Sequence, residues 1–384
     1  MQNAETVLNV LRERGRKGLP LEGIYRQLFN PQLYLLAYGR IYSNEGAMTP
    51  GPTQETADGM TTEKIEAIID AMRHERYRFS PVRRIYIPKK NGKLRPLGLP
   101  SWSDKLVGEV VRLLLEAYYE PQFSDRSHGF RPGRGCHTAL REIANTWVGT
   151  TWFIEGDISD CFGSLDHSVL LSILSEKIHD GRFLRLIANM LLAGYLEDWR
   201  WNATLSGAPQ GGVVSPILSN IYLHKLDQFV ETVLIPQYTK GMRRKRNAAY
   251  VKVERGLASA RRRGDRDDAR ELRRELRRLS FGDPCDPDYR RLRYSRYADD
   301  QSIAPASLEG ALRGIGIGAE AMESGCRNDD DGLHEGRVET AGKDRESQNE
   351  TAGSGIQEHA RQVRRFQGPQ QEQENQGQPD RAVQ

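Results

Sequence analysis

Two acidic positions, each at the end of a segment rich in β-forming residues, limit the possible folds of this chain most strongly. Asp157 follows the apolar segment Trp152–Ile154, and the pair Asp299 and Asp300 ends the segment that starts at Tyr294. Such segments are typical of short strands that end in a polar turn. Strands that are far apart in sequence can be neighbours in a sheet, so we expect the two acidic positions to meet in one sheet.

Carboxylates on neighbouring strands suit phosphoryl transfer to a 3′-hydroxyl. That reaction uses two divalent ions roughly 3.5–4 Å apart. Mg²⁺ prefers hard oxygen ligands and takes a few carboxylates, while phosphates and water complete its shell. By itself, however, an Asp pair after Tyr-Ala is more often an ordinary turn. The sequence around the acids is therefore needed to distinguish an ordinary turn from a catalytic site.

Five segments around the acids stand in one order along the chain. They are IPKKNGKLRPLGLP (87–100), SHGFRPGRGCHTAL (127–140), EGDISDCF (155–162), GAPQGGVVSPILSNIYL (207–223) and RYADD (296–300). Together they resemble the sequence blocks of reverse transcriptases encoded by group II introns. Residues 28–51 also resemble the N-terminal extension of that family, and the resemblance covers roughly residues 20–300.

This resemblance implies an α+β fold, with the fingers and part of the palm of a right-hand polymerase and an antiparallel palm sheet flanked by helices. It implies an RNA-directed DNA polymerase that acts in intron mobility and RNA splicing. The implied partners are group II intron RNA, an RNA template, a DNA primer and deoxynucleoside triphosphates, with two Mg²⁺ ions as cofactors. The implied location is the bacterial cytoplasm or an organelle.

The resemblance also assigns roles to matching positions. Asp157, Asp299 and Asp300 are expected to bind the metal ions, together with the backbone carbonyl of Ile158. Phe162 matches the aromatic residue that disfavours a 2′-hydroxyl on the incoming nucleotide; ordinary core packing is the alternative. Cys161 is expected to be a buried structural thiol.

Several further positions are expected to contact the nucleotide or the template. Three basic residues would hold the triphosphate, unless they only form a solvated turn; they are Lys89, Lys90 and Arg95. Gln210 would contact the incoming nucleotide, and Gly211 and Gly212 would let the backbone approach it. Arg131 and Arg134 would support template or nucleotide, or have a structural role in the palm.

The chain is predicted to have three parts. Residues 1–80 are mostly helical and form the N-terminal extension and the start of the fingers. Residues 81–300 form the fingers and palm, with a basic insertion at about 240–280 that holds sixteen Lys or Arg against six Asp or Glu. The insertion is predicted to be a charged helix or helical hairpin, which either binds intron RNA or is a solvated, salt-bridged structure.

Residues 301–384 form the third part, a low-complexity tail. It is rich in Gly, Gln, Glu and Ser and carries a net charge of −6, so we expect it to be disordered. Pro305 interrupts the apolar strand expected after Asp300, and the hairpin is therefore predicted to lose its second strand. No long helix follows that could form a thumb, and activity is expected to be impaired. A change of reading frame or an unrelated fusion would both produce this pattern.

Charge and cysteine content narrow the class of protein further. The net charge is +4, so residues 1–300 carry +10, which favours a polyanionic partner. The four cysteines form no CxxC pair, and no apolar run of 18 residues is present, which argues against a zinc site and a membrane span. Two other readings remain open: a non-catalytic RNA-binding protein, and a decayed gene product without a stable fold.

Overall fold

The computed structural model describes residues 3–44, 46–88, 92, 94–147, 150, 153–158, 160–198, 200–204, 206–207, 212–304 and 339–341. The chain divides into two units, Met1–Glu339 and Thr340–Gln384. A three-residue strand, β8 (Glu339–Ala341), lies at their boundary. All features below belong to the first unit.

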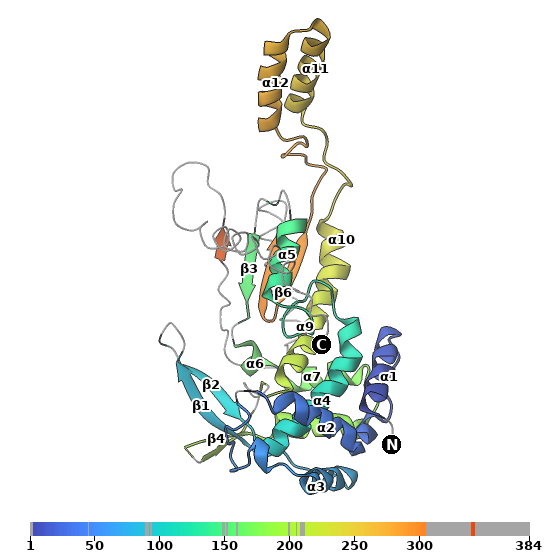
Figure 1. Ribbon diagram of the computed structural model, residues 1–384, viewed down its shortest axis with the longest axis vertical. Coiled ribbons are helices and arrows are strands. Elements are labelled where there is room, and N and C mark those ends of the chain that lie inside the picture. The colour runs from blue at the N-terminus through green and yellow to red at the C-terminus, as the bar shows by residue number, and fades with distance from the viewer. Residues whose placement is uncertain are drawn as a thin grey trace, which may run out of the picture. The chain divides into compact units, whose positions relative to one another are not determined.

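The N-terminal part is helical, as predicted, and packs on one long helix. It contains α1 (Ala4–Arg16), η1 (Ile24–Phe29), α2 (Pro31–Ile41), η2 (Ala57–Gly59) and α3 (Thr62–Arg73). The side chain of Asn30 caps α2, and Pro31 occupies its first turn, where a missing N–H costs nothing. These elements gather around α4 (Trp102–Tyr119), which is buried along most of its length and is the centre of the main hydrophobic core (Figure 1).

The first sheet has the strand order β2-β1-β4-β5. Its strands are β1 (Val82–Pro88), β2 (Leu94–Leu99), β4 (Tyr195–Glu197) and β5 (Arg200–Asn202). β1 and β2 pair antiparallel, with Ile87 opposite Arg95. β4 runs parallel to β1 and joins a distant segment to this hairpin.

The second sheet joins the two acidic positions. Its strands β3 (Phe153–Asp157), β6 (Arg293–Tyr297) and β7 (Asp300–Ala304) pair antiparallel, and β7 lies between β6 and β3. The predicted loss of the second hairpin strand is therefore wrong. β7 ends at Ala304, just before Pro305, so the missing N–H of proline falls after the last ladder position.

The same strand corrects the start of the predicted tail. Residues 301–304 belong to the sheet: residues 301–303 make ladder pairs with both β3 and β6, and Ala304 pairs with Arg293 of β6. The rest of the expected low-complexity segment, 305–338 and 342–384, lies outside the described residues.

Helices surround this sheet and continue the main core. They are η3 (Glu120–Gln122), α5 (Cys136–Thr146), α6 (Cys161–Ser164), α7 (His167–Ser175), α8 (Gly181–Leu191) and α9 (Ser215–Phe229), and α9 continues through η4 (Val230–Leu234) into α10 (Ile235–Tyr238). The side chain of Asp166 caps α7 by accepting a hydrogen bond from the Val169 amide at 2.9 Å. α9 begins at Ser215, with Val214 in the cap position and a proline in its first turn.

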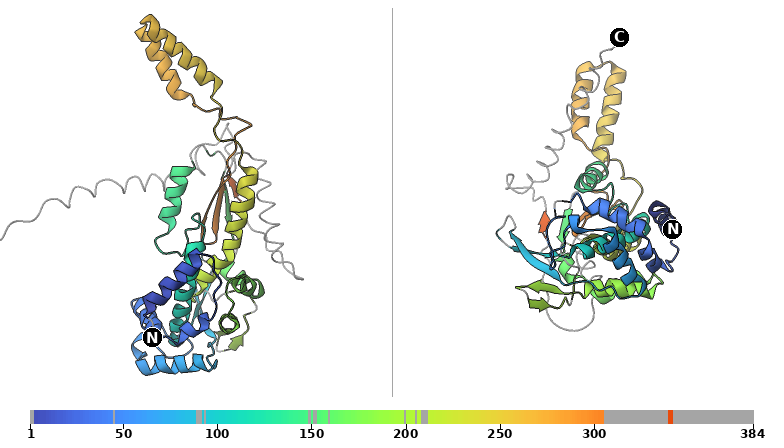
Figure 2. Two further views of the ribbon diagram at one scale, coloured as in Figure 1. Left: turned by 90° about the vertical axis from the view of Figure 1, so that its right-hand side faces the viewer. Right: turned by 60° about the horizontal axis from the view of Figure 1, so that its bottom comes forward.

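The basic insertion is a helical hairpin, one of the two forms predicted. α11 (Ala248–Arg263) and α12 (Arg266–Arg278) lie side by side (Figure 2), and Gly264 at φ 76° forms the link between them. They share a small core of Leu257, Ala260 and Ala269. Within the described part of the chain, no helix is long and apolar enough to span a membrane.

Candidate active site

The acid pair lies in a tight turn. Tyr297 and Asp300 are the last paired residues of β6 and β7, so Ala298 and Asp299 form a two-residue hairpin loop. Ala298 has a φ of 57°, the left-handed value required at the first position of a type II′ turn. A non-glycine residue in that region is strained by roughly 1–2 kcal/mol, so the surrounding structure must hold the turn.

Three catalytic candidates meet at this turn. Asp157 is the direct partner of Asp300 in the ladder between β3 and β7, and Asp299 is next to Asp300. Partial burial and the negative charges of Asp157, Asp299 and Glu155 raise the pKa of Asp300 above its usual value. Like charges directly opposite each other are unfavourable in a sheet, so the cluster favours a cation.

The donor set fits a hard divalent ion that also takes ligands from a substrate. Among the described residues, no three His, Cys, Asp or Glu side chains are grouped closely enough to enclose an ion by themselves. Mg²⁺ needs no such cage, because it usually binds one or two carboxylates together with water and substrate phosphates. Ile158 follows β3 directly after Asp157.

Phe162 and Cys161 lie on α6, directly after the acidic strand. Phe162 is partly exposed, and its ring makes an edge contact with that of Phe130 at a centroid distance of 6.0 Å. Cys161 is buried, as expected, and contacts Ser219 of α9. Burial raises the pKa of its thiol, and the nearby charges of Asp299 and Asp157 add to the increase. Burial and the neighbouring carboxylates thus favour the protonated form of the thiol.

α6 also contacts the loop that carries the predicted nucleotide-binding residues. Gly207 packs on the backbone of Phe162 and Gly163 at a φ of 88°; a Cβ there would be 2.6 Å from the carbonyl oxygen of Phe162. The Gly207 amide also donates to the carbonyl of Leu165 at 2.7 Å. Gln210 and Gly211, which follow in this loop, lie outside the described residues.

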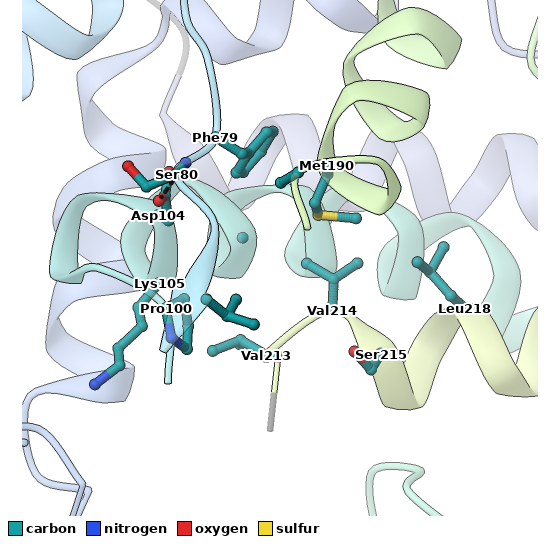
Figure 3. Close-up of a pocket in the computed structure, with 14 residues that line it drawn as sticks. Phe79, Ser80, Pro100, Asp104, Lys105, Met190, Val213, Val214, Ser215 and Leu218 are labelled. Carbon is teal, nitrogen blue, oxygen red and sulfur yellow. Dashed lines mark hydrogen bonds between the residues drawn. The ribbon is translucent and has the colours of Figure 1, made fainter. Parts of the chain in front are cut away.

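The end of the loop, just before α9 begins, lies at a small apolar pocket (Figure 3). Gly212 lines this pocket with Val213 and Val214, opposite Gly108 of α4. A Cβ at Gly108 would be 3.3 Å from a Val214 methyl carbon, so the close approach of loop and helix depends on this glycine. Val214, two residues after Gly212, belongs to the main core.

Asp104 of α4 also lines this pocket. This buried carboxylate accepts hydrogen bonds from the Tyr77 hydroxyl at 2.7 Å, the Ser101 hydroxyl at 2.7 Å and the Ser80 amide at 3.1 Å. Burial raises the pKa of Asp104, while these hydrogen bonds favour its charged form. The segment that enters β1 is thus tied to the first turn of α4.

The basic residues predicted to bind nucleotide or template differ in their surroundings. Arg95 is exposed on β2, and Lys89 and Lys90 lie outside the described residues. Arg131 is buried, donates to both carboxylate oxygens of Glu120 at 3.1 Å, and also bonds two loop carbonyls. Arg134 donates to the Asp125 carbonyl at 2.6 Å. These contacts correspond to the structural role that was weighed for both arginines.

Four residues that surround the turn were not singled out from the sequence. They are Gly129, Asn220, Asp227 and Arg296, and all four are buried. Arg296 and Tyr294 are two residues apart on β6, so both point to its inward face. An arginine on the inward face of a strand is a signal that a buried carboxylate must be present elsewhere in the chain.

Comparison with known proteins finds similarity to reverse transcriptases and to proteins encoded by introns. The profile of the family "Reverse transcriptase (RNA-dependent DNA polymerase)" matches residues 87–248. "Group II intron-encoded protein LtrA" of Lactococcus lactis subsp. cremoris is 52% identical over 208 residues, which cover 54% of this chain and 35% of the relative. The "Uncharacterized 91 kDa protein in cob intron" of Schizosaccharomyces pombe is 44% identical over 279 residues, which cover 72% and 34%.

"Protein YkfC" of Escherichia coli K12 is also similar, at 35% identity over 240 residues that cover 59% of this chain and 61% of that protein. The chain spans about a third of the length of the first two relatives. The family match over residues 87–248 includes β3, Phe162 and the loop before α9, while the turn with Asp299 and Asp300 lies beyond it. The chain belongs to the reverse transcriptases of the type encoded by group II introns.

Proposed function

We propose that this chain provides the polymerase part of an RNA-directed DNA polymerase that acts in group II intron mobility and in splicing of the intron RNA. The observation that carries the proposal is the pairing of Asp157 with Asp300 beside the Asp299 turn. Its partners would be the intron RNA, an RNA template, a DNA primer and deoxynucleoside triphosphates. It would act in a bacterial cytoplasm or in an organelle.

In this proposal Asp157 and Asp299 hold two Mg²⁺ ions, with help from Asp300 and the Ile158 carbonyl. When bound, the ions lower the pKa of the primer 3′-hydroxyl and neutralise charge on the leaving pyrophosphate. The carboxylates fix the position of this chemistry on a rigid sheet, which suits a reaction whose rate depends on alignment.

Other residues of the chain would orient the nucleotide. Lys89, Lys90 and Arg95 would contact the triphosphate, and Gln210 with the glycines after it would contact the nucleotide itself. Phe162 would narrow the space beside the sugar, with Phe130 supporting its ring. Arg131 and Arg134 would support the template side by holding the loop between η3 and α5.

The test is single-nucleotide primer extension on an RNA template with the full chain. Asp157→Asn and Asp299→Asn should each abolish extension and leave RNA binding intact, because they remove charge from the cluster and change no shape. Asp70→Asn is the matched control, since Asp70 is an exposed carboxylate on α3 whose ion-pair partners are His74 and Arg76. Equal extension by Asp299→Asn and the parent would refute the assignment.

The basic helical hairpin favours a second function, binding of intron RNA without catalysis. The small shared core of α11 and α12 leaves their arginines on the surface, where they can neutralise phosphates. RNA binding by a chain that extends no primer, even with Mn²⁺ in place of Mg²⁺, would support this function over the first.

A further inference from the structure

A fully buried ion pair lies directly behind the catalytic turn. Neither Arg296 on β6 nor Asp227 on α9 exposes any of its side chain to solvent. The guanidinium grips the carboxylate in a fork: Nε donates to Oδ1 at 2.8 Å and Nη2 donates to Oδ2 at 2.7 Å. The Tyr294 hydroxyl donates to the same carboxylate at 2.7 Å.

The remaining donors of Arg296 reach the turn and its surroundings. Nη1 donates to the carbonyl oxygen of Ala298 at 2.7 Å and to the Asn220 side chain at 3.3 Å, and Nη2 donates to the Ser127 hydroxyl at 2.8 Å. An arginine has five N–H donors, and here each has an acceptor. The guanidinium therefore links β6, α9 and the loop before Gly129 to the peptide that precedes Asp299.

A purely stabilising role explains this arrangement poorly. Removing two charges from water costs several kcal/mol per ion, and hydrophobic residues of similar volume often stabilise a core equally well or better. A hydrophobic side chain, however, could not hold the Ala298 carbonyl. Ala298 needs such a hold, because its positive φ is strained and persists only where neighbours fix it.

α9 extends the link to the nucleotide side of the site. Asn220 and Asp227 are two helical turns apart, so they share one face of α9, and both bond Arg296. The Asn220 amide also donates to the Gly129 carbonyl at 2.9 Å. α9 begins directly after Gly212–Val214, the segment over the pocket. One rigid helix thus connects the catalytic turn to the proposed nucleotide loop.

We propose that Arg296 and Asp227 are positioning residues that hold the Ala298–Asp299 turn in its metal-binding geometry, with Asn220 as their connection to the nucleotide side. The inference rests on the proposed function. It predicts that the pair controls the affinity of the acid cluster for divalent ions, separately from its effect on folding.

The experiment uses the full chain and Mn²⁺ as the probe, measured by electron paramagnetic resonance, with the melting temperature and single-nucleotide addition recorded in parallel. The double variant Arg296→Met with Asp227→Leu replaces the pair by hydrophobic residues. It should melt below the parent, because the Tyr294 hydroxyl loses its acceptor, yet remain folded and bind Mn²⁺ about 10–100-fold more weakly, the usual loss when a partner behind a metal ligand is removed. Single-nucleotide addition should fall by a similar factor.

Arg296→Lys covers the case in which the double variant does not fold. Lysine keeps the charge beside Asp227 but lacks the planar fork, so it cannot hold the carboxylate and the Ala298 carbonyl together. The matched control is Arg112→Met with Glu109→Gln on α4. This is a second Arg–carboxylate pair, in which Arg112 donates to Glu109 and also to Glu116. The control should keep the parent's affinity for Mn²⁺.

Parent-like Mn²⁺ affinity in a folded double variant or in Arg296→Lys would overturn the inference and leave the pair a packing feature. So would a parent chain that binds Mn²⁺ no better than Asp157→Asn. If the parent binds Mn²⁺ but extends no primer, the proposed function fails, while a weaker affinity in the variants still supports the positioning role.

Discussion

Gly129 offers the sharpest test of how closely the catalytic turn is packed. An ideal Cβ at Gly129 would lie 2.2 Å from the amide nitrogen of Ala298, 2.7 Å from its Cα and 2.9 Å from its Cβ. Ordinary contacts begin at 3.4 Å, so the shortest of these distances is too short by about 1.2 Å. None of the three atoms belongs to a flexible side-chain end that could move aside.

The turn should absorb most of this displacement. The Gly129 carbonyl is fixed to Asn220 of α9, and the preceding His128 amide donates to the Arg296 carbonyl at 2.8 Å. A misplacement of about 1 Å at a reacting centre typically costs on the order of 10²-fold in rate. We therefore expect Gly129→Ala to reduce single-nucleotide addition about 100-fold, with a destabilisation of about 1–3 kcal/mol from overpacking.

The assay is single-turnover addition of one deoxynucleotide to a primer on an RNA template, with melting recorded for each chain. Gly135→Ala is the matched control in the same loop, because its Cβ would enter open space and its φ of −178° suits any residue. If Gly129→Ala folds and extends within about threefold of the parent, the turn is not held by this contact and the geometric argument fails.

Three further outcomes are expected. Phe162→Ala should raise the incorporation of ribonucleotides relative to deoxynucleotides by about tenfold, the effect of opening a small steric gap; an unchanged ratio would mean that its ring only packs against Phe130. Replacing 248–280 by a short glycine linker should flatten the salt dependence of RNA affinity. Each lost phosphate contact lowers the slope of log affinity against log salt concentration by roughly 0.7–0.9. The Asn247 amide donates to the Phe281 carbonyl at 3.0 Å, so the ends of this segment are close enough to join. Asp104→Ala should lower the free energy of unfolding by about 2–4 kcal/mol, because it leaves the buried hydroxyls of Tyr77 and Ser101 without an acceptor; a denaturant titration that finds less than about 1 kcal/mol would contradict that reasoning.

Local patterns made much of the fold predictable. The strand that ends at Asp157 and the strand that leads into the Asp299 turn are short runs of β-formers followed by acids, and the helix at Asp166 has its cap in the sequence. The basic insertion was predicted to be a charged helix or a helical hairpin, and the structure contains the hairpin of α11 and α12. Each of these features depends on neighbours a few residues away, which a single sequence displays directly.

The errors arose where the outcome depended on a distant partner. Pro305 was taken to remove the second hairpin strand, but a proline removes only its own N–H, and the residues before it suffice for β7 once β3 lies on the other side. The ion pair of Arg296 with Asp227 joins positions 69 apart in sequence. No local period marks such a pair, so the residues that hold the turn were missed although the acids in it were found.

The central place of β7 has a consequence for the smallest chain that can hold this site. β3 brings Asp157 and β6 brings the turn, but the two strands do not pair with each other, since β7 separates them. A chain that ended at Asp300 would contain every acidic residue of the motif and still lack the strand that joins them. The residues from Gln301 to Ala304 carry no catalytic group, and their backbone is what assembles one site from two distant segments.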